Sequence, residues 1–385
     1  MTLVGAALSE HPLATHAVGE SVGRLLELGG PRPDVVTLFA TEPHLGSLDD
    51  VVGAVRHLLE PRALVGASMQ SVLAGSREVM DHAAVSLMAI WFGGTRVRPV
   101  RIDSRPGSDG PELRGLPALD DASGTLVLLT DPFTFPSATA VGELARRAPA
   151  LSVVGGAASA ARRPGGNRLV LDGALHDHGA VGLWIDDTTP LAAVVSQGCT
   201  PIGEPFTVTS AERTMVRELG GRPALERLLE TVDGLDDDDR ARAASGLLLG
   251  RVVDEMRETF GPGDFLVRGV LGADRDAGAL AVADEIPVGA TVQFQVRDAP
   301  GATRDLVDSL GGISAAGALC LSDVARGSEL FGAVDHDSTT VTDALDGAPV
   351  AGAFCAGTYG PVGGRVALHD SAVSMLLVDP RPTWG

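Results

Sequence analysis

One order of elements recurs along this chain and constrains its fold more than any other feature. In its first copy (34–92), a short apolar strand is followed by a helix, a strand ending in Val-Gly, a glycine-containing loop and an Ala-Val strand. The same order returns over 124–186 and, with a longer first loop, over 313–379. Short β-branched runs alternating with helical segments are typical of α/β folds. The recurrence predicts internal repetition.

The spacing inside the copies supports this prediction. Leu38 to Gly66 spans 28 positions, Leu128 to Gly155 spans 27, and Cys320 to Gly352 spans 32 with its extra loop. An alternative stays open, in which an α/β chain reuses Val-Gly-Ala strands through composition alone. We predict an α/β protein in which repeated β-α-β-β units form mixed sheets flanked by helices.

The second half contains a stretch that does not fit the repeat. Residues 191–312 are predicted to be a partly β insertion, with a hairpin around PFTVTSAERTMVREL and a helix over 236–260. Residues 103–123 are rich in Gly, Asp and Pro and are predicted to be a surface loop. The chain is therefore expected to divide into a domain over 1–190 and a domain over 191–385.

Charge and composition exclude several classes of function. The net charge of −20 repels nucleic acid and anionic membrane surfaces, so neither is expected as a partner. All 30 basic residues are arginine, a composition typical of GC-rich, actinobacterial-like genomes. Without lysine, the chain can form neither a Schiff base nor a phosphate-binding loop that depends on lysine.

The three cysteines, Cys199, Cys320 and Cys355, lie far apart without a CxxC pair. This spacing argues against a disulfide framework or zinc site and suits a reducing cytoplasm. The N-terminus lacks a basic signal-peptide region, and no apolar run is long enough for a membrane helix. Established catalytic motifs and cofactor motifs are absent, so neither enzymatic activity nor a cofactor is expected. A Cys–His pair that meets only in space stays possible.

An ordered series of segments carries a resemblance to a known family. The segments are DVVTLFATEPH, ALVGAS with Gly75-Ser-Arg-Glu78, and AAVSLM in the first half, and ELGGRPALE, GDFLVRGVLG, PVGATVQFQVRDA, ARGSELFG, DHDSTTV, PVAGAF, GPVGG and LHDSAVSMLLV in the second. The first half resembles the FIST N domain and the second half resembles the FIST C domain.

The resemblance implies a stand-alone cytoplasmic sensory protein that binds a small ligand, such as an amino acid, in signal transduction. The chain departs from the family pattern at Thr358, where relatives usually carry a glutamate. It also reads Asp323-Val-Ala-Arg326-Gly327 where relatives often have Cys-Asn-Gly-Arg-Gly.

Arg326 and Gly327 follow an apolar strand and are the first candidates for ligand binding. Ligands of open α/β sheets gather beyond the carboxyl ends of strands, where a guanidinium can hold a carboxylate with two hydrogen bonds. The alternative is a structural ion pair with one of the 50 acidic residues.

Five further residues are candidates for ligand contacts at strand ends or inside a strand. They are Thr358, Tyr359, Arg268, Ser68 and Ser159. Tyr359 could form a pocket wall, the two serines could bind an anion, and Arg268 could bind a ligand or an internal acid. The alternatives are a packed turn, small residues in tight turns, and a salt bridge. Histidines beside aspartates at the last strand of each copy match no zinc signature, so no metal is expected.

The favoured function is therefore a sensor of a small ligand, with a possible signalling protein as its partner. The first alternative is a protein–protein adaptor without a small ligand. The second is an uncharacterised hydrolase or transferase that uses a Cys–His pair.

Overall fold

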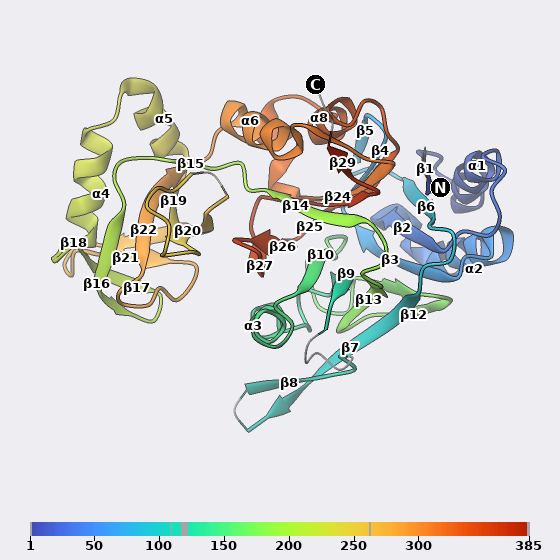
Figure 1. Cartoon of the computed structure of the whole chain (residues 1–385), viewed down its shortest axis with the longest axis horizontal. Helices are drawn as coiled ribbons and strands as arrows, with labels where there is room; N and C mark the ends of the chain where they lie inside the picture. The colour runs from blue at the N-terminus through green and yellow to red at the C-terminus, as the bar shows by residue number, and fades with distance from the viewer. Residues whose placement is uncertain (1, 109, 117–121, 262, 383–385) are drawn as a thin grey trace. The chain divides into compact units, whose positions relative to one another are not determined.

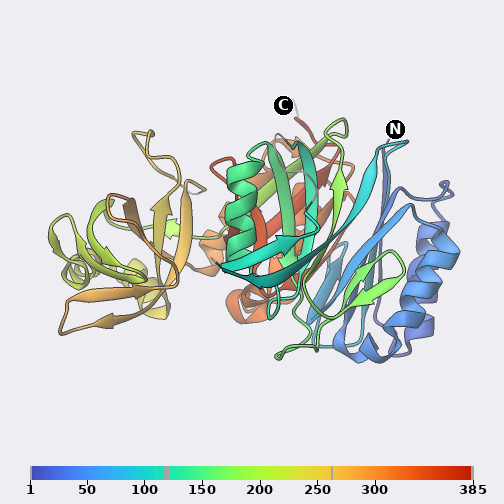
Figure 2. The same cartoon turned by 90° about the horizontal axis from the view of Figure 1, so that it is seen from below.

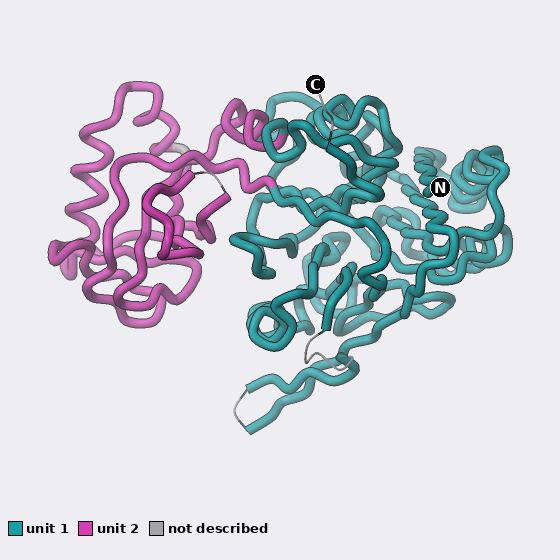
Figure 3. The backbone as a smooth tube through the Cα atoms, viewed as in Figure 1, with its two compact units in different colours: residues 1–195, 307–385 teal, residues 196–306 magenta. Residues whose placement is uncertain are grey.

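The computed structural model describes residues 2–108, 110–116, 122–261 and 263–382. The chain forms two compact units (Figure 3): unit 1 comprises residues 1–195 and 307–385, and unit 2 comprises residues 196–306. The sequence suggested a division at residue 190. Instead, the chain returns to unit 1 within helix α6 (Ala299–Leu310), so the third repeat packs with the first two. Unit 2 lies within the predicted insertion.

Each repeat forms the centre of one mixed sheet of unit 1 (Figures 1 and 2). In every sheet the first strand of the repeat pairs in parallel with the Val-Gly strand and antiparallel with the last strand. This arrangement confirms the predicted α/β class with mixed sheets. The repeat-1 sheet has the order β1 (Leu3–Ser9), β6 (Val85–Trp91), β2 (Val35–Thr41), β3 (Ala63–Met69), β11 (Leu169–Leu171), β12 (Ala174–His176). The repeat-2 sheet has the order β8 (Gly110–Arg114), β7 (Val97–Gly107), β13 (Ala180–Ile185), β9 (Gly124–Thr130), β10 (Leu151–Ala157), β26 (Thr358–Val362), β27 (Arg365–His369). The repeat-3 sheet has the order β14 (Leu191–Ser196), β28 (Val373–Val378), β24 (Gly317–Asp323), β25 (Val350–Cys355), β4 (Ser71–Ala74), β5 (Arg77–Met80).

The glycines of the Val-Gly strands occupy one equivalent position in the three sheets. The register pairs Leu38 with Gly66, Leu128 with Gly155 and Cys320 with Gly352, the same pairs whose spacing marked the repeat in the sequence. A Cβ built on Gly66, Gly155 or Gly352 would lie 2.0, 2.0 or 1.7 Å from the carbonyl oxygen of the paired residue. Glycine is therefore required for the close approach of these strands.

A β-hairpin forms the glycine-containing loop that was predicted in repeats 1 and 3, and in repeat 2 a hairpin follows the loop predicted at 162–167. The hairpin β4–β5 of repeat 1 pairs with β25 of repeat 3, β11–β12 of repeat 2 pairs with β3 of repeat 1, and β26–β27 of repeat 3 pairs with β10 of repeat 2. The exchange is cyclic, so unit 1 has approximate three-fold internal symmetry. The strands of the exchanged hairpins are three to five residues long and gain stability from pairing with another repeat. The loop prediction was wrong in repeats 1 and 3, because this pairing is non-local, whereas residues 162–167 of repeat 2 contain no strand or helix.

One hydrophobic core lies between the three sheets and contains side chains from all of them, such as Phe39, Leu129 and Leu321. Helices α1 (Ala14–Leu26) and α2 (Leu48–Leu59) cover the outer face of the repeat-1 sheet, and α3 (Ser137–Arg147) covers that of the repeat-2 sheet. In repeat 3, β24 leads into η2 (Val324–Arg326), α7 (Ser328–Phe331) and α8 (His336–Ala344). Side chains alternate along β24, so Ser322 faces away from the core that holds Leu321.

Unit 2 is a closed β-barrel with two helices. Its strand order returns to its start because β19 pairs with both β20 and β22. The barrel strands are β16 (Phe206–Glu212), β17 (Met215–Leu219), β21 (Ala279–Val282), β20 (Phe265–Asp274), β19 (Leu247–Val252) and β22 (Thr291–Val296), with α4 (Ala224–Asp233) and α5 (Asp237–Ser245) beside them. The helix predicted over 236–260 was wrong beyond residue 245, since LLLGRV forms the strand that closes the barrel.

The surface loop predicted over 103–123 was also wrong in its described first part. Strand β7 pairs with β13 on one side and with β8 on the other, and β7 and β8 together form a two-stranded ribbon (Figure 1). Polar and basic residues dominate this ribbon because both of its faces are partly exposed beyond Ile102. Residues 117–121 lie outside the described part of the chain.

Candidate functional site

Arg326 lies at the end of η2, just beyond the carboxyl end of β24, and its side chain is fully buried. Its Nε and Nη2 atoms donate to the two carboxylate oxygens of Asp337 at 2.8 and 2.9 Å, a bidentate ion pair within unit 1. The geometry therefore matches the structural alternative that the sequence left open for Arg326. A ligand contact by this residue stays a prediction.

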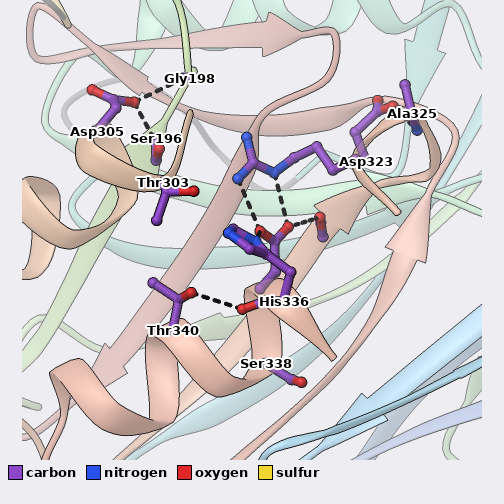
Figure 4. A network of polar contacts seen from close by, with 12 residues as sticks. Ser196, Gly198, Thr303, Asp305, Asp323, Ala325, His336, Ser338 and Thr340 are labelled. Carbon is purple, nitrogen blue, oxygen red and sulfur yellow. Dashed lines mark hydrogen bonds and ion pairs between the residues drawn. The ribbon is translucent and has the colours of Figure 1, made fainter. Parts of the chain in front are cut away.

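Asp337, in the first turn of α8, is the centre of a buried polar network, and Figure 4 labels its neighbour His336. Besides Arg326, it accepts a hydrogen bond from the Ser322 hydroxyl at 2.6 Å, and His336 Nδ1 lies 3.0 Å from Oδ1. Burial alone would raise the pKa of Asp337, but the Arg326 charge and these hydrogen bonds outweigh it and hold the pKa well below its usual range. Asp337 is therefore a carboxylate throughout the physiological pH range.

An aromatic ring closes the network on one side. Phe331 stacks on His336 with ring centroids 3.4 Å apart, and the Arg326 guanidinium lies 5.3 Å from the Phe331 ring centroid. Both contacts hold polar groups in place against an apolar surface. The network is thus built as a packed structural element.

The exchanged hairpin of repeat 1 adds a second carboxylate, Glu78 of β5. Its Oε1 accepts the Ser338 backbone N–H at 2.9 Å, while its own N–H donates to Asp335 at 2.6 Å. Burial, together with the charges of Asp337 and Asp335, raises the pKa of Glu78. The sequence analysis named Glu78 only as part of the family resemblance and assigned it no role in a site, because only the hairpin exchange brings it to α8.

We expect Glu78→Gln to raise the melting temperature at neutral pH. Since folding raises the pKa of Glu78, its ionisation costs stability as the pH rises through the folded value, and the cost is absent below the unfolded value. Glutamine cannot ionise but keeps an oxygen for the Ser338 N–H. The gain should be present at about pH 7 and absent at about pH 4, measured by thermal denaturation. The exposed Glu42→Gln is the control, and an equal gain at both pH values would contradict the assignment.

Gly327, Thr358 and Tyr359 are buried in different surroundings. A Cβ on Gly327 would lie 2.3 Å from Met80 Cε of the exchanged hairpin. Thr358 pairs with Gly156, and its buried hydroxyl lacks a hydrogen-bond partner among the described residues. The Tyr359 hydroxyl lies 2.9 Å from Thr130 Oγ1 and 2.6 Å from Ser137 Oγ, so it joins the third repeat to α3 of the second.

The two serines and Arg268 bond within the protein. Ser68 Oγ accepts the Arg168 N–H, and Ser159 Oγ accepts the Gln70 N–H and donates to the Phe354 carbonyl. Ser159 thus connects all three repeats. Arg268, in unit 2, donates to Asp284 at 3.0 Å. Arg268 belongs to unit 2 and the other six predicted residues belong to unit 1, and the ligand-binding roles of all seven stay predictions.

The cysteines have raised rather than lowered pKa values where a shift is resolved. Burial, with the charges of Asp337 and Glu78, raises the pKa of the Cys320 thiol, and burial with the charge of Asp323 raises that of Cys355. Both thiols are therefore protonated and weakly nucleophilic. Within the described residues, no three His, Cys, Asp or Glu side chains come together as metal ligands. No described helix is long and apolar enough to cross a membrane.

A solvent-open cavity of about 450 Å³ lies at the start of β7, in the part of this strand that pairs with β13 rather than with β8. We call it the ribbon-base cavity; its lining residues are Arg96, Arg98, Ala122, Ser123, Trp184, Asp186 and Asp187. The Arg98 guanidinium lies over the Trp184 ring, 5.3 Å from its centroid. Neither Arg96 nor Arg98 forms a salt bridge with any carboxylate in the described ranges. The Thr188 N–H and, to a smaller extent, the Arg96 charge lower the pKa of Asp186, so the cavity holds guanidiniums beside carboxylates.

Comparison with known protein families assigns each half of the chain to a domain family. Residues 34–222 match the FIST N domain and residues 224–361 match the FIST C domain. An uncharacterised protein of Mycobacterium bovis (strain ATCC BAA-935 / AF2122/97) is 39% identical over 382 residues, covering 97% of this chain and 98% of the relative. An uncharacterised protein of Mycobacterium tuberculosis (strain ATCC 25618 / H37Rv) is 38% identical, covering 97% of this chain and 99% of the relative.

Proposed function

Because the chain belongs to the FIST family, a family linked to sensory signalling, we propose that it is a cytoplasmic sensor of a small molecule. The ligand is an amino acid or another small carboxylate, and the protein passes its bound state to a signalling partner.

The ribbon-base cavity is the observation that carries this proposal. Its volume of about 450 Å³ lies in the range of small-molecule sites. Its two arginines form no salt bridge with a carboxylate in the described ranges, although Asp186 and Asp187 line the same cavity. A carboxylate ligand would satisfy these guanidiniums with charge-assisted hydrogen bonds.

The protonated thiols of Cys320 and Cys355 favour binding over catalysis. A Cys–His hydrolase needs a cysteine whose pKa is lowered towards neutrality, and burial shifts both of these in the opposite direction. We therefore propose a sensor without enzymatic activity of its own.

A thermal-shift screen of the purified full chain with amino acids and small carboxylates tests the proposal. A ligand at about a hundred times its Kd stabilises a protein by about 2.7 kcal/mol, so a true ligand should raise the Tm by several degrees. Chloride at the same concentration and ionic strength is the control. If no compound in either class raises the Tm, the sensor proposal fails.

A different observation favours the adaptor alternative. Phe133 is 41% exposed and lines a second cavity, of about 490 Å³, together with Pro106, Pro111 and Pro136. Exposed aromatic and proline side chains are common in protein contacts. If no small molecule in the screen raises the melting temperature, the result would support this alternative.

A further inference from the structure

The walls of the ribbon-base cavity are set by strand register. Arg98 of β7 pairs with Trp184 of β13, and the Asp186 N–H donates to the Arg96 carbonyl at 3.2 Å. Arg98 and Trp184, which are paired in register, therefore point to the same face of the repeat-2 sheet, and Arg96 and Asp186, just outside the two strands, line the same cavity.

The acidic side of the cavity is held in place by hydrogen bonds. Trp184 Nε1 donates to the Ser123 carbonyl at 3.1 Å, and the Ser123 hydroxyl donates to Asp187 Oδ2 at 2.7 Å. Asp186 Oδ1 accepts the Thr188 N–H at 3.0 Å, which lowers the pKa of Asp186. Both carboxylates are thus oriented before a ligand arrives, which reduces the entropy that binding must cost.

The charges around the cavity select between classes of small molecule. Among the described residues, two guanidiniums and two carboxylates line it, and these four charges sum to zero. A dicarboxylate would be attracted by the arginines but repelled by Asp186 and Asp187. A simple amine would be attracted by the two aspartates but repelled by the arginines. A molecule with one carboxylate and one ammonium group can place each beside its opposite charge.

We propose that the ribbon-base cavity is the ligand site of this sensor and that it selects a compact zwitterion, with the ligand carboxylate on Arg98 and Arg96 and its ammonium group towards Asp187 and Asp186. The inference rests on the proposed function and deepens it, because it assigns the site and the charge pattern of the ligand. It places the site at the opposite end of the repeat-2 sheet from the carboxyl end of β9, where strand-tip reasoning would look.

The test compares matched compounds and matched variants of the full chain. The probes are the common L-amino acids, glycine betaine, the N-acetyl and amide derivatives of any amino acid that raises the Tm, and succinate. The variants are Arg98→Ala, Asp187→Asn and, as control, Arg105→Ala, which removes an exposed guanidinium from the same strand outside this cavity. Binding is measured by thermal shift and by the fluorescence of Trp184, assigned with Trp184→Phe.

We expect a zwitterion to bind the wild type and Arg105→Ala alike, and Arg98→Ala and Asp187→Asn at least about tenfold more weakly. Unchanged far-UV circular dichroism shows that the variants fold. A zwitterion that binds Arg98→Ala as tightly as the wild type overturns the site but leaves the sensor proposal standing. N-acetyl forms or succinate that bind equally well overturn the selection for zwitterions. A complete absence of binding to the wild type overturns the inference and the sensor proposal together.

Discussion

Arg326→Ala is expected to lower the free energy of unfolding of unit 1 by about 3–5 kcal/mol. The variant leaves Asp337, which is 1% exposed, as a buried carboxylate without its cation. It also leaves the Phe331 ring without the guanidinium that lies over it. The loss is measured by urea denaturation followed by circular dichroism, with the transition of unit 1 analysed separately from that of unit 2.

Two further variants test whether the loss comes from the unpaired buried charge. Arg77→Ala removes a guanidinium that is 57% exposed and pairs with Asp335, so little change is expected, since exposed ion pairs contribute little. The double variant Arg326→Met with Asp337→Leu removes both buried charges and should recover much of the loss. If Arg326→Ala costs no more than Arg77→Ala, the ion pair is not a structural element and the ligand role of Arg326 gains weight.

Gly352→Ala is expected to destabilise the protein by about 3 kcal/mol, at the upper end for overpacking. Its Cβ would lie 1.7 Å from the Cys320 carbonyl oxygen, and both atoms belong to paired strands that cannot separate without breaking the ladder. The exchanged strand β4 pairs with β25 on its other side, so strain in β25 also weakens the contact between repeats. Thermal and urea denaturation measure the effect.

The equivalent glycines and an open glycine provide the comparison. Gly66→Ala and Gly155→Ala should destabilise by a similar amount, because each Cβ would lie 2.0 Å from a carbonyl oxygen. Gly142, in helix α3, has open space around its Cβ position, and Gly142→Ala should be stabilising by about 0.5–1 kcal/mol. A Gly352→Ala variant as stable as Gly142→Ala would contradict the close approach of the strands.

Much of unit 1 follows from the sequence because its signals are local or repeated. The spacing from Leu38 to Gly66, repeated at Leu128–Gly155 and Cys320–Gly352, is the register of the parallel strand pairs. A strand that is buried on both faces has a short, continuous apolar and β-branched sequence wherever it occurs. Here such strands occupy the same places in all three repeats. The repeat can therefore be recognised from residue types and their spacing.

The second half was harder to predict where local preference and tertiary pairing disagree. LLLGRV follows a helix that begins at a good cap, Asp236, and ends at Gly246, a stop signal that the prediction of a helix to residue 260 passed over. Pairing with both β20 and β22 makes it a barrel strand instead. Closing the barrel removes its free edges, an effect that acts over residues distant in sequence.

The candidate sites show the same division. The sequence placed Arg326 beyond a strand end, which is correct, but its partner Asp337 and its neighbour Glu78 depend on where α8 and the exchanged hairpin lie. No sequence motif indicates the ribbon-base cavity, because Arg98, Ser123 and Trp184 come from three separate segments.

The sequence by itself determined the repeated strands, the glycines where paired strands approach closely, and the acidic, lysine-free composition. These features depend on residue type and spacing alone. The tertiary structure alone decided the cyclic exchange of hairpins, the strand that closes the barrel and the partners of each buried charge. These features are non-local: short strands and single charges have no stable state of their own, and their free energy is set by the residues they meet after folding.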